Sequence, residues 1–104
     1  MNQTMKYPLV RVVWKDIVTI VGNVTLDELR IKKLPLMENV GYLLLKDKDK
    51  VVLLSQVQLT EDGIGQETKD GNDATIIPVG VIVKLEKITI CLPKRLKKIV
   101  NKIQ

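Results

Sequence analysis

The sequence predicts a mainly β protein. Two apolar runs rich in Val and Leu, at 40–45 and 51–59, flank a short charged turn at 46–50, which is the pattern of a β-hairpin buried on both faces. The chain has no Phe, one Trp and two Tyr, so its core must be built from the aliphatic residues that suit pleated surfaces. At 104 residues and 45% apolar content it can form one compact core, and we expect a single domain over 1–104.

The first expected strand covers 7–20. Alternation along a strand places Val10, Val12 and Trp14 on one face and the residues between them on the other. Trp14 should therefore lie with the valines.

A short helix is expected at 26–33. Thr25 and Glu28 have the spacing of a capping box, in which the hydroxyl and the carboxylate satisfy free amides at a helix start. Pro35 ends this element and favours an extended chain that leads into the second strand at 40–45.

The second half of the chain resumes β composition after a polar break. Residues 60–74 contain three glycines and five acids, which predicts a mobile loop. Strand composition returns at 75–90, where Pro78 suits an edge or a strand junction because it cannot donate to a ladder. Apolar residues then recur at helical spacing, which predicts a basic amphipathic helix over about 93–103.

Together these elements suit a small five-stranded barrel of the SH3-like or Sm-like kind over about 7–90, with a short helix after the first strand and the C-terminal amphipathic helix outside it. A sheet with helices packed on one face is the alternative.

The net charge of +5 is unevenly spread. Residues 61–73 carry a net of about −4, and the chain from residue 84 onward carries about +6. An acidic loop and a basic tail could attract an anionic partner or let the chain pair with itself head to tail, whereas ordinary solvated charge is the alternative. For the C-terminal helix we favour packing between copies over contact with phosphates or an acidic membrane surface.

Catalysis has little support in the sequence. The chain has no histidine, the usual general base, so none can activate Ser55 as a nucleophile. Asp47 and Asp49 belong to a Lys-Asp alternation typical of a solubilising turn. We therefore expect no enzyme, no metal and no cofactor. The lone Cys91, the lack of a leader and the lack of a spanning apolar run favour a cytoplasmic protein without membrane contact.

Nucleic-acid binding is a further hypothesis. Small barrels bind single strands by stacking bases on aromatic residues along a basic groove, and only Trp14, Tyr7 and Tyr42 are aromatic here. Trp14 beside Arg11 or Lys15 could stack a nucleotide, but an ordinary core role for Trp14 is the alternative.

Three segments of the chain resemble a loose group of short phage and prophage proteins. They are VRVVWKD at 10–16, VGYLL at 40–44 with VVLLS at 51–55, and IIPVGVI at 76–82. The shared pattern is W-x-D, a V-G-(Y/F)-L-L hairpin and I-P-x-x-x-I. The resemblance implies a protein that acts by binding in the cytoplasm of an infected bacterium. Some similar proteins block a host protein, and some sequester, as compact oligomers, the cyclic nucleotides that host defence systems use as alarm signals.

Our preferred hypothesis is sequestration of a cyclic nucleotide at an interface between copies of the chain, which counteracts host antiphage defence. Such a site needs cations, a stacking aromatic and loop amides. The candidate residues are Arg11, Trp14, Lys15, Ser55, Gln56 and Gly65, the last within the loop 63–71. The alternatives are an Sm-like RNA-binding protein and a direct inhibitor of a host defence protein.

Overall fold

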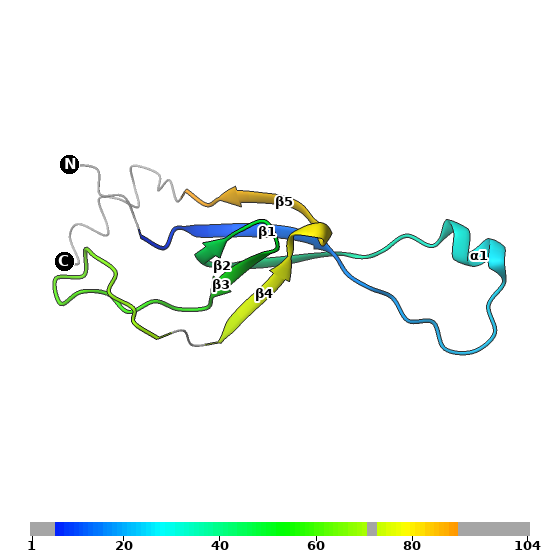
Figure 1. The fold of residues 1–104 in the computed structure, drawn as a ribbon, viewed down its shortest axis with the longest axis horizontal. Helices are drawn as coiled ribbons and strands as arrows, with labels where there is room; N and C mark the ends of the chain where they lie inside the picture. Colours follow the sequence, from blue (N-terminus) through cyan, green and yellow to red (C-terminus); the bar gives the residue numbers. More distant parts are fainter. Residues whose placement is uncertain (1–5, 71–72, 90–104) are drawn as a thin grey trace, which may run out of the picture.

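The structure, a computed structural model, describes residues 6–70 and 73–89. Its five strands form one antiparallel sheet in the order β4-β3-β2-β1-β5 (Figure 1). The elements are β1 (Leu9–Lys15), α1 (Leu26–Ile31), β2 (Leu36–Lys46), β3 (Lys50–Leu54), β4 (Ala74–Pro78), the 3₁₀ helix η1 (Val79–Val81) and β5 (Ile82–Lys87). The mainly β class and the five strands are confirmed. The predicted helix at 93–103 and Cys91 lie outside the described residues.

The sheet is open at its two edges. Strands β4 and β5 each pair with one neighbour and not with each other, so the predicted barrel is not closed. Pro78, the last residue of β4, has no N–H for a ladder and is followed at once by η1, which carries the chain to the opposite edge. Pro78 therefore lies on an edge strand at a junction, as the sequence predicts.

One apolar cluster nevertheless joins all five strands. Its buried members are Val10, Val12, Val51, Leu53 and Ile77, and Trp14, Leu43, Val79, Val81, Ile82 and Leu85 pack against it. Because both edge strands contribute side chains to this cluster, the sheet must curve around it. The core is aliphatic, as the composition predicts.

β1 is shorter than predicted. It ends at Lys15, and residues 16–20 leave the sheet although their composition suits a strand. A strand needs a hydrogen-bonded neighbour, and β1 has partners in β2 and β5 only from Leu9 to Lys15. The predicted alternation is confirmed within β1, where Val10 and Val12 are fully buried and Trp14 packs beside them.

Residues 16–35, called the arm here, connect β1 to β2. Figure 1 shows the arm reaching away from the sheet, with α1 near its far end. The predicted capping box is present, because Glu28 N–H donates to Thr25 Oγ1 at 3.1 Å and Thr25 N–H donates to Glu28 Oε2 at 3.4 Å. No residue of α1 is buried, so the cap positions a helix that packs on nothing in the sheet.

The β2–β3 hairpin forms around the predicted charged turn. Asp47 closes the turn by accepting from the N–H groups of Asp49 and Lys50, both at 2.8 Å. These two bonds, that from Lys50 first, hold the pKa of Asp47 below its ordinary value. β2 begins earlier than predicted and β3 ends earlier, at Leu54, because the following residues find no partner in the ladder.

The two strands of the hairpin differ in how far they are buried. β3 is buried on both faces, as predicted, whereas β2 leaves Val40, Leu44 and Leu45 exposed. Gly41 lies where β2 comes close to the backbone of β3: a Cβ there would lie 3.0 Å from the carbonyl oxygen of Leu54. The glycine of the V-G-Y-L-L motif thus has a packing reason.

Candidate functional site

The six predicted ligand residues do not form one cluster. Arg11 and Trp14 lie on opposite faces of β1, because Trp14 packs on the core while Arg11 pairs with Glu38 and Glu86 on the outer face. A single small ligand bound to one chain cannot contact both side chains. The stacking site of Trp14 beside Arg11 is therefore not built within one copy.

The remaining four residues lie at two ends of the sheet. Lys15 is the last residue of β1, at the base of the arm. Ser55, Gln56 and Gly65 follow β3, near the other end of β1. The ends of β1, Leu9 and Lys15, are six positions apart, so about 20 Å divides the two groups at ~3.4 Å per residue.

Arg11 is held in an ion network on the outer face. Its guanidinium donates to Glu86 Oε1 at 2.8 Å and to Glu38 Oε2 at 3.2 Å, and Lys84 Nζ lies 3.3 Å from Glu86 Oε2. The hydrogen bonds that Arg11 donates to Glu38 and then to Glu86 raise the pKa of Arg11, and those that Glu86 accepts from Arg11 and then from Lys84 lower the pKa of Glu86. Two cations and two carboxylates cancel, so this network offers a phosphate no net positive charge.

We expect this network to make stability depend on acid pH. The lowered pKa of Glu86 means that its contribution is present above the ordinary carboxyl pKa and is lost as pH falls through the lowered value. Between about pH 6 and about pH 3, the thermal unfolding midpoint should fall further in the native protein than in Glu86→Gln, measured by circular dichroism. Equal losses in the two proteins would contradict a role for the network.

Trp14 has two structural partners. Its ring packs against the core cluster, and its indole N–H donates to Asn39 Oδ1 at 2.7 Å. Asn39 faces Val12 in the β1–β2 register, so the hydrogen bond crosses between the two strands. Both contacts favour a structural role for the ring.

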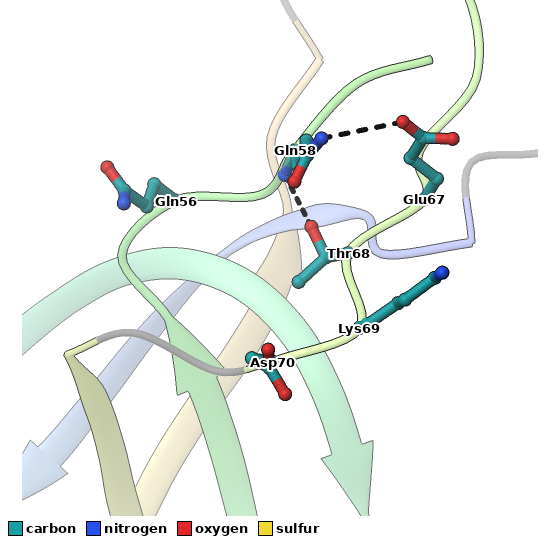
Figure 2. A pocket seen from close by; sticks show the side chains of 6 residues that line it. All are labelled: Gln56, Gln58, Glu67, Thr68, Lys69 and Asp70. Atoms are coloured by element: carbon teal, nitrogen blue, oxygen red, sulfur yellow. Dashed lines mark hydrogen bonds between the residues drawn. The ribbon is translucent and has the colours of Figure 1, made fainter.

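A polar hollow of about 350 Å³ lies beside the loop after β3. Its lining residues are Gln56, Gln58, Glu67, Thr68, Lys69 and Asp70 (Figure 2). Two carboxylates against one ammonium leave the hollow with a negative balance, which opposes a phosphate. Gln56 points away from the hydrogen-bonded pair Gln58 and Glu67 (Figure 2). The one predicted ligand residue in this hollow is therefore in an unsuitable environment for a nucleotide.

Residues 59–66, which include the first part of the loop predicted at 60–74, form a small hairpin. Leu59 and Gln66 form a β-bridge, Thr60 N–H donates to the carbonyl of Gly65 at 2.9 Å, and Gly63 turns the chain with a φ of +75°. Asp62 accepts from Thr60 and from the N–H of Ile64, which lowers its pKa. The ionised form of Asp62 thus supports the shape of the loop tip.

Gln66 anchors this hairpin to the start of β1. Its side-chain oxygen accepts from Tyr7 N–H at 2.7 Å, and its amide donates to the Tyr7 carbonyl at 3.1 Å. Tyr7 is itself buried. Nothing in the sequence signals this pair, because the two residues are 59 positions apart.

A second hollow, of about 530 Å³, lies at the base of the arm. It is lined by Lys15, Lys32, Lys33, Leu34 and Leu36, and it is called the lysine hollow here. Lys15 directly precedes the arm, whereas Lys32 and Lys33 lie near its end. The two ends of the arm are joined by a hydrogen bond, in which Asp16 N–H donates to the Pro35 carbonyl at 3.0 Å. Within residues 6–70 and 73–89, none of these lysines forms an ion pair. Lys15 is the predicted site residue in this hollow, and Lys32 and Lys33 were missed.

The arm carries much of the exposed apolar surface. Eight of the 17 exposed large apolar side chains among the described residues belong to it: Ile17, Val18, Ile20, Val21, Leu26, Leu29, Ile31 and Leu34. Ile17, Val21 and Ile31 are between 79% and 93% exposed. Large exposed apolar surface is typical of interaction sites, and eight such side chains on one segment point to one here.

No family model, curated protein or solved structure matches this chain. A role for it has to follow from its own residues. Across the part of the chain that the structure describes, no group of three His, Cys, Asp or Glu side chains could hold a metal ion. None of the described helices has the length and apolar character to cross a membrane.

Proposed function

We propose that this protein is a non-enzymatic binding protein that acts through contact with another protein chain, and that the arm makes this contact. The observation that carries the proposal is the exposed apolar surface of the arm, which no part of the described sheet covers. Burying a side chain such as Ile17 or Ile31 is worth about 1.5–3 kcal/mol relative to leaving it in water. Several such side chains on one projecting element therefore favour a covering partner.

The short helix supports the same proposal. α1 has six residues and buries none of them. Isolated helices shorter than ~12–15 residues are marginal in water, and most helical stability in proteins comes from packing. The capping box and the exposed ion pair between Asp27 and Arg30 add little to the stability of α1. Packing of Leu26, Leu29 and Ile31 on a partner would supply what the chain itself lacks.

We also propose that the sheet is an opened barrel of the SH3-like or Sm-like kind. The strand order, with β1 between β2 and β5, and the short η1 turn between the two edge strands support this architecture. The shared core of both edges supports it too. The arm is then a long connection between the first two strands of this barrel-like sheet.

Sequestration of a cyclic nucleotide is the second candidate, and the lysine hollow favours it. Three cations that form no ion pair with any described carboxylate lie beside Leu34 and Leu36, and they offer phosphate contacts and an apolar wall for a base. This site differs from the predicted one in all residues but Lys15. The phage-protein resemblance is compatible with both candidates, since it implies either a nucleotide trap or a direct inhibitor of a host defence protein.

In-cell photo-cross-linking tests the first candidate. A cross-linking residue placed at Ile17 or Ile31 should give discrete protein adducts, which a second change, Leu26→Ser, should reduce at both positions. The same residue at the exposed Lys48 in the β2–β3 turn serves as the control. Arm positions that cross-link no more than Lys48 would overturn the proposal, and intact nucleotide adducts in native mass spectra would then favour the second candidate.

A further inference from the structure

The loop after β3 and the base of the arm carry opposite charges on similar apolar patches. At the end of the loop after β3, Leu59 and Ile64 are exposed among four carboxylates, those of Glu61, Asp62, Glu67 and Asp70. With Lys69, residues 59–70 have four negative charges against one positive, a net of −3. At the base of the arm, Leu34 and Leu36 are exposed among the three lysines of the lysine hollow, a charge of +3.

One chain cannot bring these patches together. The molecule is 62 Å along its longest axis, and the acidic loop and the arm extend towards opposite ends of it (Figure 1). The loop is anchored to the start of β1 by Gln66, and the lysine hollow begins at the end of β1 with Lys15. The rigid sheet between them keeps the patches apart, whereas a second copy can present its loop to the hollow.

We propose that copies of this chain associate head to tail, with the acidic loop 59–70 of one copy seated at the lysine hollow of the next. This inference rests on the proposed function, since it names a second copy as the chain that the arm contacts. Ile64 at the loop tip, 62% exposed, meets Leu34 and Leu36, while the carboxylates around it face Lys15, Lys32 and Lys33.

The loop is preorganised for such a contact. The bridge between Leu59 and Gln66, the hydrogen bonds around Thr60 and the anchor to Tyr7 fix its shape before association. A preordered loop loses less conformational entropy on binding than a free one. The contact is heterologous, because different patches meet, so repeated association closes a ring or extends into a filament.

Paired charge reversal tests the contact. One variant carries Lys32→Glu with Lys33→Glu, and the other carries Glu67→Lys with Asp70→Lys; all four residues are exposed, so folding should be retained. In sedimentation velocity each variant alone should associate at least about tenfold more weakly than the native chain, because like charges then meet. An equimolar mixture should recover association, since each variant's loop then meets a complementary hollow. High salt should weaken association of the native protein.

Matched controls separate the possible failures. Lys46→Glu with Lys48→Glu makes the same charge change at exposed residues that belong to neither patch and should leave association unchanged. A native chain that stays monomeric at every concentration overturns the inference, as does mixing that fails to restore association. Association that survives charge reversal but is lost in Ile17→Ser with Ile31→Ser overturns the head-to-tail contact while the arm remains a protein-binding element.

Discussion

Leu54→Ala is expected to lower the free energy of unfolding by about 2–5 kcal/mol. Leu54 is 1% exposed, on the central part of the sheet between its register partners Tyr42 in β2 and Ala74 in β4. Truncation removes buried apolar surface and leaves a cavity that a sheet paired on both sides cannot collapse. Urea unfolding followed by circular dichroism measures the loss.

Leu44→Ala is the matched control for this prediction. The chemical change is the same and the residue lies on the neighbouring strand, but Leu44 is 45% exposed. Its loss should stay below about 1 kcal/mol, because less surface leaves water on folding. Similar losses at the two positions would show that the burial of β3 is not what stabilises the sheet.

Trp14→Ala is expected to destabilise the protein by about 2–3 kcal/mol, less than for a fully buried ring because Trp14 is only half-buried. The ring packs on the core cluster and its N–H pairs with Asn39, so truncation removes both packing and a hydrogen bond between strands. Thermal unfolding monitored by circular dichroism checks the size of the loss.

Trp14→Phe separates the two contributions. It keeps an aromatic ring on the core face but leaves Asn39 Oδ1 without its donor, which should cost about 1 kcal/mol. A Trp14→Ala protein with native stability would contradict the structural role and return the ring to the nucleotide-stacking hypothesis. A large loss in Trp14→Ala and a small one in Trp14→Phe would assign the ring to the core.

The sequence predicted those elements whose cause lies within a few residues. The capping box of Thr25 and Glu28, the β2–β3 turn and the placement of Trp14 with the valines all follow from local spacing, and all are confirmed. Strand ends were predicted less well. Residues 17–20 have strand composition, yet β1 ends at Lys15, because a strand extends only as far as a neighbour pairs with it.

The predicted site was also incomplete, because it depends on contacts between residues far apart in the sequence. Residue type suggested that Arg11 could hold a phosphate, but its charge is taken up by Glu38 and Glu86 from two other strands. Residue type also gave no reason to group Lys15 with Lys32 and Lys33. These lysines come together because the end of the arm pairs with its beginning at the sheet. Of the basic tail considered for head-to-tail pairing, residues 90–104 lie outside the described residues, and the lysine hollow is a different cation cluster.

By itself, then, the sequence determined a mainly β protein with five strands, an aliphatic core and a capped helix after the first strand, because period-two alternation and capping act between near neighbours. The tertiary structure alone decided that Arg11 is neutralised, that Gln66 anchors the acidic loop to Tyr7, and that the arm stands clear of the core. These features depend on which strands pair and where pairing stops, and such contacts join residues 17 to 75 positions apart that no local pattern relates.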